Sequence, residues 1–310
     1  MNPELFLADL EAKPAALRAL ADSLGSAFLD LPVDVRRVLF LGMGSSRYAA
    51  RVAALRLRAA GIDAVAEYAS AVPYEPGPGT LVVAISATGA SRETLDALAG
   101  RPGHVAVTNV PGSPVTEGAA LTVPMLAGEE KGGVACRTFQ HTLALLLALN
   151  AHLTGSPAVA GLARRAADAT SDLLDRREEW LPRALELLDG PSGVHAIAPA
   201  ERLSSAEQSA LMVREGPRRA ADACETGDWA HVDVYLTKTL DYRALLFPGS
   251  RYDEQAMDWI RQRGSTVVAV GAGVRDAAFS IRYRHDEDPD VALLTETLIA
   301  ELVSATWWSR

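Results

Sequence analysis

Three hydroxyl side chains lie close together where an apolar segment ends: Ser86, Thr88 and Ser91. Residues 81–85 are apolar and partly β-branched, which predicts a buried strand. The amphipathic run at residues 94–99 predicts a helix that ends before a glycine. A turn from strand to helix places free backbone N–H groups and the positive end of the helix dipole beside these hydroxyls. One hydroxyl would serve only as a helix cap. Three exceed that need, and they predict a phosphate site.

A second polar turn, residues 42–47 (Gly-Met-Gly-Ser-Ser-Arg), follows another apolar segment. A dinucleotide fingerprint also lies after a first strand, but it needs glycine where this chain has Arg47. Glu67 could bind a ribose, so a dinucleotide site stays open as a weaker alternative. The chain has no Gly-Lys-Ser/Thr tripeptide, which excludes a P-loop. The two hydroxyls of the turn suit sugar or phosphate oxygens.

The composition narrows the class of protein. The chain has 310 residues, 49% of them hydrophobic, and a formal net charge of -9. This charge argues against nucleic acid or an anionic membrane as the main partner. The two cysteines, Cys136 and Cys224, lie far apart and show no metal-ligand spacing, so we expect no disulfide and no metal. The first residues do not resemble a targeting signal, and we expect a cytoplasmic protein.

Strand and helix patterns alternate along the chain, which predicts parallel sheets covered on both faces. The predicted strands are residues 38–42, 65–68, 81–85, 105–109, 121–124, 194–198, 232–236, 244–247 and 266–270. The predicted helices are residues 4–28 (interrupted near Pro14), 48–55, 94–99, 138–152, 157–189, 253–263 and 291–307, and one that starts with a capping box at Ser204. The second half repeats the pattern of the first, which indicates two doubly wound units.

Taken together, the motifs resemble the sugar isomerase (SIS) domain, and in particular the isomerase half of glucosamine-6-phosphate synthase. The resemblance rests on residues 42–46, 68–70, 86–89, 108–114 and 128–136, and their order and spacing make it specific. It implies two flavodoxin-like α/β/α SIS domains in tandem. The expected boundaries are a helical lead-in at 1–35, SIS domain 1 at 36–156, a helical linker at 157–190 and SIS domain 2 at 191–310.

The resemblance also implies which residues hold the substrate. The phosphate would be bound by hydroxyls and one backbone group, at Ser46, Ser86, Ala87, Thr88 and Ser91. The rest of a phosphorylated sugar or amino sugar would contact Gly44, Ser45, Val134 and Ala135. No cofactor is implied.

Two residues of the second half correspond to the family's catalytic groups. Glu215 would move a proton between sugar C1 and C2, and His231 would open the sugar ring of a neighbouring subunit, so a homodimer is implied. Read alone, each residue would be an ordinary surface or strand-edge group. The family's lysine one turn before the glutamate falls on Met212, and the family's C-terminal lysine tail has no counterpart before Arg310. We therefore predict an aldose–ketose isomerase, with or without deamination. The alternative is a non-catalytic phosphosugar sensor.

Overall fold

The strands of this α/β chain form two five-stranded sheets in which all neighbours are parallel. The computed structural model describes residues 1–28, 30–31, 34–71, 76–157 and 159–310. These residues divide into two units. The unit of residues 15–129 and 135–164 is called here the N-terminal unit, and that of residues 1–14, 130–134 and 165–310 the C-terminal unit. The domain boundaries predicted from the sequence stay predictions.

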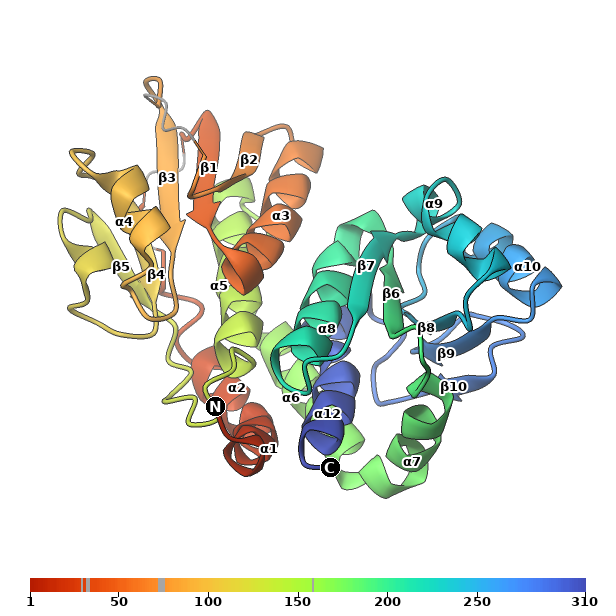
Figure 1. Ribbon diagram of the computed structural model, residues 1–310. Helices are drawn as coiled ribbons and strands as arrows, with labels where there is room; N and C mark the ends of the chain where they lie inside the picture. Colours follow the sequence, from red (N-terminus) through yellow and green to blue (C-terminus); the bar gives the residue numbers. More distant parts are fainter. Residues whose placement is uncertain (29, 32–33, 72–75, 158) are drawn as a thin grey trace. The chain divides into compact units, whose positions relative to one another are not determined.

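The N-terminal unit contains a sheet with the strand order β2-β1-β3-β4-β5 (Figure 1). The strands are β1 (Arg37–Gly42), β2 (Asp63–Tyr68), β3 (Thr80–Ile85), β4 (Val105–Thr108) and β5 (Leu121–Pro124), and the helices are α3 (Gly44–Ala59), α4 (Arg92–Leu98) and α5 (Arg137–Thr154). Leu39 and Leu41 of β1 pack on one face of the sheet with Ala97 and Leu98 of α4. Because side chains alternate along a strand, the residues between them face the other side, where α3 packs against β1, β2 and α5.

The C-terminal unit contains a sheet of order β7-β6-β8-β9-β10, the same order when each sheet is numbered from its own first strand. Its strands are β6 (Val194–Ala198), β7 (Ala221–Glu225), β8 (Arg243–Leu246), β9 (Thr266–Val270) and β10 (Phe279–Ile281). Its helices are α7 (Arg177–Leu188), α8 (Leu203–Glu215), α9 (Thr226–Trp229), α10 (Asp253–Gln262), α11 (Pro289–Thr295) and α12 (Thr297–Trp308); α6 (Ala160–Asp175) leads into the unit. Helices α9 and α10 cover one face, and α8 and α12 pack together on the other.

Of the two N-terminal helices, the first belongs to the C-terminal unit, and the second belongs to that unit only as far as Pro14. Helix α1 (Pro3–Glu11) packs against α12, and α2 (Lys13–Ala21) begins directly after it. Pro14 is the second residue of α2, where a missing N–H costs no helical hydrogen bond. The predicted helix is therefore two helices, with the break just before Pro14.

Two sequence predictions in the second half were wrong. Residues 232–236 were expected to be a strand, but they lie in a 3₁₀ helix, Asp233–Lys238. The alternation of apolar and polar residues suggested a strand. In the structure the buried residues are Val234 and Thr237, which are three positions apart, and this spacing suits a 3₁₀ turn. The sheet edge is instead occupied by β7, whose sequence Ala-Asp-Ala-Cys-Glu carries almost no strand signal.

The prediction that a capping box at Ser204 starts the helix was also wrong. Helix α8 begins at Leu203, and its N-cap residue Arg202 makes no side-chain capping bond. A short 3₁₀ turn, Ala200–Arg202, runs directly into the helix, so Ser204 lies inside its first turn. Strand β10 has only three residues and had no predicted counterpart.

One run, Pro289–Trp308, is long and apolar enough to cross a membrane by length and composition alone. In the structure 89% of the apolar stretch within this run is buried inside the protein, and α12 packs against α1, α7 and α8. This is how the core helix of a globular unit behaves.

Candidate functional site

The strand order reverses direction between β1 and β3 in the N-terminal unit, and these strands are direct neighbours. In open α/β sheets, ligands bind at such a switch point, in the crevice outside the carboxyl ends of the strands. The turn after β1 carries residues 42–46, and the turn after β3 carries residues 86–91. The tertiary structure therefore brings together two polar turns that lie far apart in the sequence.

The first turn leads directly into α3. Gly44 adopts a left-handed φ of 47°, which glycine accepts without strain. Gly42 is equally constrained, because a Cβ there would lie 3.0 Å from the Cβ of Ser46. The N-cap residue Met43 makes no side-chain capping bond, so no side chain of the N-cap closes the N-terminus of this 16-residue helix, and the backbone N–H of Ser46 donates to the carbonyl of Met43 at 3.1 Å. Ser45 and Ser46 are both half-buried at this N-terminus.

The second turn is built tightly around Gly89, which has a φ of 66°. A Cβ at this position would lie 1.8 Å from the Oγ of Ser113. The backbone N–H of Gly89 donates to the carbonyl of Ser86, and that of Asn109 donates to the carbonyl of Ala87. Ser86 is buried and Thr88 is exposed. The turn thus has a fixed backbone with hydroxyls at two different depths.

Ser91 has a competing partner. It is the N-cap residue of α4, yet its hydroxyl donates to the carboxylate of Glu93 at 3.0 Å and accepts from Thr94 at 3.3 Å. A backbone hydrogen bond and then the Ser91 hydroxyl lower the pKa of Glu93. A phosphate that used the Ser91 hydroxyl would have to displace an ionised carboxylate, so Ser91 is the weakest of the predicted phosphate ligands.

The corresponding switch point of the C-terminal unit lies between β6 and β8, and it is filled by the chain itself. The carboxylate of Asp253 accepts from the backbone N–H groups of Gly249 at 2.6 Å and Ser250 at 3.0 Å. The buried guanidinium of Arg202 pairs with Glu296 at 3.0 Å and also donates to the carbonyl of Pro248. An internal anion occupies the donors that a phosphate would need. Of the two switch points in the described residues, the N-terminal one is therefore the better suited to a ligand.

The two predicted catalytic residues lie in the C-terminal unit. Glu215 is the last residue of α8 and is half-buried. Burial raises the pKa of its carboxyl, and the negative charge of Glu130 raises it further. The segment Glu130–Val134 belongs to the same unit, so Val134 and the predicted base share one unit, whereas Ala135 begins the next stretch of the other. Met212, one turn before Glu215, is 1% exposed.

His231 follows α9 and is exposed. Its backbone N–H donates to the carbonyl of Asp228 at 2.8 Å, which fixes the turn. Two exposed apolar neighbours, Val232 and Tyr235, are 54% and 61% accessible. His231 therefore lies in an exposed segment that also carries two exposed apolar side chains.

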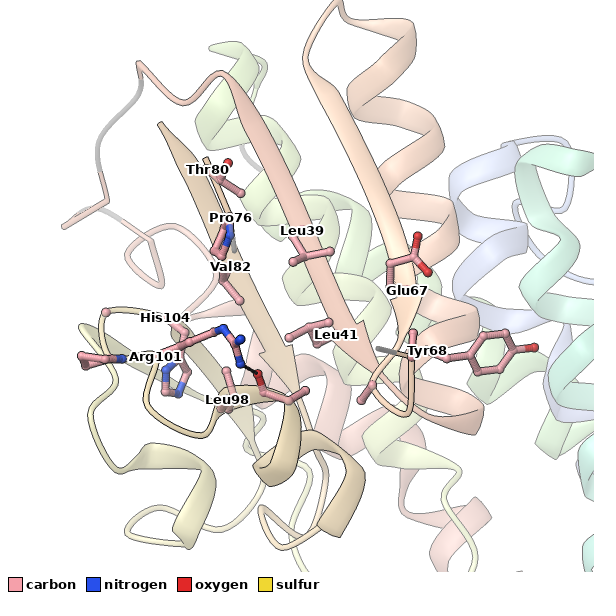
Figure 2. Close-up of a pocket in the computed structure, with 15 residues that line it drawn as sticks. Leu39, Leu41, Glu67, Tyr68, Pro76, Thr80, Val82, Leu98, Arg101 and His104 are labelled. Atoms are coloured by element: carbon pink, nitrogen blue, oxygen red, sulfur yellow. Dashed lines mark hydrogen bonds between the residues drawn. The ribbon is translucent and has the colours of Figure 1, made fainter. Parts of the chain in front are cut away.

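A cavity of about 340 Å³ lies on the α4 face of the N-terminal sheet (Figure 2). Its apolar wall includes Leu39, Leu41 and Val82, and Arg101 on its rim donates to the carbonyl of Ala97 at 3.1 Å. None of the predicted phosphate, sugar or catalytic residues lines it, but Glu67, the possible ribose ligand, and Tyr68 and Ala69 of the family motif do. The apolar part of the wall carried no sequence signal, since it consists of ordinary core residues.

The dinucleotide alternative gains no support from the helix that follows the first turn. Arg47 is buried, and its guanidinium lies over the ring of Tyr68 at 3.9 Å from the centroid. This side chain occupies the position at which the fingerprint requires a bare backbone. Within the part of the chain that the structure describes, no group of three or more His, Cys, Asp or Glu residues could hold a metal ion.

Comparison with known proteins assigns the N-terminal unit to a family. Residues 33–151 match the family model of the SIS domain, so this part of the chain is a SIS domain. The chain is 30% identical over 261 residues to a glutamine–fructose-6-phosphate aminotransferase (isomerizing) from Aeropyrum pernix, in a match that covers 76% of this chain. It spans 42% of the length of that relative.

Solved structures show the same fold over nearly the whole chain. The C-terminal domain of glucosamine-fructose-6-phosphate aminotransferase from Francisella tularensis superposes with a TM-score of 0.84 at 17% identity, covering 98% of this chain and 96% of that one. Tagatose-6-phosphate ketose/aldose isomerase from Escherichia coli gives a TM-score of 0.77 at 16% identity, with coverages of 97% and 92%. The predicted resemblance is confirmed.

Proposed function

We propose that the chain binds a hexose or hexosamine 6-phosphate and interconverts its aldose and ketose forms. The observation that carries this proposal is the contrast between the two switch points. The N-terminal one offers hydroxyls and backbone donors, whereas the C-terminal one is filled by Asp253. The similarity to glutamine–fructose-6-phosphate aminotransferases supports the same substrate class.

The proposed phosphate ligands are Ser46, Ser86, Ala87, Thr88 and Ser91, with Gly44, Ser45, Val134 and Ala135 around the sugar. The acidic net charge of -9 gives no general attraction for anions, so this local pocket has to supply the affinity. The C-terminal sheet, with its matching strand order, is proposed as a second SIS domain that supplies catalytic groups.

In the proposed reaction, Glu215 is the general base. Its carboxylate removes the proton from C2 of the open-chain aldose, which leaves an enediol, and returns that proton to C1 while the hydroxyl proton passes from O2 to O1. A raised pKa suits this role, because a carboxylate whose conjugate acid titrates closer to neutrality is the stronger base for removing the proton from C2. His231 would open the sugar ring.

The assembly and location follow from the same proposal. A His231 that serves a neighbouring site requires a homodimer with active sites shared across its two-fold interface. We further propose a cytoplasmic protein without a cofactor, acting on a small phosphorylated sugar and not on nucleic acid or a membrane.

Solvent-deuterium exchange tests the reaction directly. The protein in D₂O is incubated with glucose, fructose and glucosamine 6-phosphates, and deuterium at C1 and C2 is measured by NMR. We expect exchange with wild-type protein and a loss of about two to four orders of magnitude in Glu215→Gln, which keeps the shape but removes the basic site. Glu201→Gln, at an exposed glutamate in the same unit, is the matched control.

A non-catalytic sensor is the second candidate, and the buried Met212 favours it, because a thioether can neither carry a proton nor pair with a charge. Wild-type protein that binds a sugar phosphate tightly yet exchanges no deuterium would establish the sensor and refute the isomerase.

A further inference from the structure

The cavity on the α4 face of the N-terminal sheet has no role in the proposed reaction. Its volume of about 340 Å³ is more than twice the ~150 Å³ of an apolar cavity that binds benzene, and it falls within the ~300–1,000 Å³ typical of small-molecule sites. Protein interiors are close-packed, with few voids larger than a water molecule. A space of this size therefore suits a molecule with one ring and a short side chain.

The strand register determines which side chains form the sheet side of the cavity. Leu39 of β1 pairs with Val82 of β3, and Leu41 of β1 pairs with Glu67 of β2. Paired residues of neighbouring strands point to the same face of a sheet. The carboxylate of Glu67 therefore lies on the same face as the three apolar side chains, and all four residues line the cavity.

The C-terminal sheet shows how the same face is filled elsewhere in this chain. Strands β7, β6 and β8 take the places of β2, β1 and β3 in the strand order, and α10 follows β8 as α4 follows β3. There, Trp229 and Tyr242 pack into the buried cluster on this face and are 0% and 1% exposed. The corresponding cluster of described residues in the N-terminal unit is aliphatic, and it includes four buried alanines: Ala69, Ala84, Ala97 and Ala106. The smaller side chains leave volume that a ligand can fill.

Glu67 brings a negative charge to this apolar wall. Its side chain is half-buried, and among the described residues it has no hydrogen-bond or ion-pair partner. A carboxylate beside an apolar wall is only partly hydrated, so a cation that reaches it gains a charge-assisted hydrogen bond. Figure 2 shows Glu67 on one side of Leu39 and Leu41 and Arg101 on the opposite side. We therefore expect a ligand cation at the β2 side of the cavity, away from the guanidinium.

His104 adds a second acceptor to the lining of the cavity. The side chain is buried, and its Nε2 lies 2.8 Å from the carbonyl oxygen of Val115. Because a carbonyl oxygen can only accept, Nε2 carries the proton, and Nδ1 of the neutral ring is left as an acceptor. Within the part of the chain that the structure describes, this Nδ1 has no partner. Both Glu67 and His104 therefore favour a ligand that donates hydrogen bonds.

We propose that this cavity binds a small organic amine, whose ammonium pairs with Glu67 while its apolar ring fills the space over Leu39, Leu41 and Val82. The net charge of -9 favours the approach of a cation to the chain. The bound amine contacts Leu41, which directly precedes the first polar turn, but it does not use the phosphate ligands. The proposal is independent of the proposed isomerase, since no residue of that reaction takes part.

Three molecules that share a phenyl ring and a two-carbon chain test the proposal: 2-phenylethylamine, 2-phenylethanol and 3-phenylpropionate. NMR titration of the full-length chain, followed at the methyl signals of Leu39, Leu41 and Val82, gives both the location and the affinity. We expect the amine to bind about tenfold more tightly than the alcohol, and the carboxylate to bind most weakly. Glu67→Gln should reduce the affinity for the amine to that for the alcohol. Glu117→Gln, at an exposed glutamate of the same unit, is the matched control.

A second variant tests the cavity itself. Val82→Phe places a larger side chain in the space, and it should abolish binding of both the amine and the alcohol. If this variant does not fold, the change in Glu67→Gln decides alone, because Glu67 is only half-buried. Tighter binding of the carboxylate than of the amine, or an amine affinity that Glu67→Gln leaves unchanged, would overturn the proposal. Amine binding that shifts none of the three methyl signals would also overturn it.

Discussion

The hydroxyls of the two polar turns differ in what they can contribute to a phosphate. Ser86 is buried at the end of β3, Thr88 is exposed, and Ser91 is engaged by Glu93. A hydroxyl that is sheltered from water and does not have to leave a carboxylate makes the stronger charge-assisted bond. Ser86 is therefore the residue on which binding should depend most.

Replacing Ser86 by alanine should weaken binding of a hexose 6-phosphate by about 1–3 kcal/mol, the cost of losing one charge-assisted hydrogen bond. Isothermal titration calorimetry measures this, with Ser280→Ala, at an exposed serine of β10, as the control. Binding of the unphosphorylated sugar should stay equally poor in both variants. Equal affinities of the wild-type protein for a sugar and its phosphate would contradict a phosphate site.

The raised pKa of Glu215 leads to a prediction about how the reaction rate depends on pH. Because burial and Glu130 raise it above the usual value near 4.5, the carboxylate gains a proton at a higher pH than an exposed glutamate would. The rate should therefore fall as the pH drops through this raised pKa and reach a plateau above it. Steady-state rates between about pH 4 and 8 test the sign. A rate that stays constant down to the pKa of an ordinary glutamate would argue against Glu215 as the base.

At the scale of elements, the turn after β3 depends on a glycine. Gly89 has both a left-handed φ and a neighbour that leaves no room for a Cβ. Gly112 also has a left-handed φ, of 79°, but a Cβ added there would have no atom within 4 Å. A substitution at Gly112 therefore adds backbone strain alone, whereas one at Gly89 adds both backbone strain and a steric clash.

Gly112→Ala should cost about 1–2 kcal/mol of unfolding free energy, from the left-handed backbone alone. Gly89→Ala should cost about 3 kcal/mol or more, since the clash with Ser113 adds to that strain. Urea denaturation of both variants measures the difference. Adding Ser113→Gly to the Gly89 variant should recover part of the loss, and similar losses in the two single variants would show that the turn relaxes freely.

For the whole molecule, the proposed shared site predicts a dimer. Sedimentation should give about twice the 32.9 kDa mass of the chain. The exposed Val232 and Tyr235 beside His231 would lie at the interface, and Tyr235→Glu should weaken the association.

Complementation tests the sharing itself. Glu215→Gln and His231→Ala chains are inactive alone, but a mixed dimer has one site with both groups intact. After equal mixing and subunit exchange, about a quarter of wild-type activity should return, because half of the dimers are mixed and each has one working site. A fully active monomer, or no recovery in demonstrably mixed dimers, would contradict a site built from two subunits.

The sequence by itself predicted the α/β class and the two turns of small polar residues. It also predicted nine strands, and eight of them are strands in the structure. These features are local: periodicity, β-branching and glycine all act within a few residues. The sequence-based prediction was wrong where packing with distant residues outweighs the local preference for strand or helix. Strand β7 forms from Ala-Asp-Ala-Cys-Glu because β6 offers an edge, while the more strand-like residues 232–236 turn into a 3₁₀ helix.

Only the tertiary structure decided which turns act together. Parallel pairing of β1 with β3 brings the two polar turns to one edge, and the tertiary structure buries Lys13, the first residue of α2, against Glu301 of α12. Neither relation is visible in the spacing, because 288 residues separate the lysine from its partner. The contact of Glu93 with Ser91 and those of Asp253 with Gly249 and Ser250 join residues only two to four positions apart, but they depend on the backbone conformation of each turn, which the residue types alone do not fix.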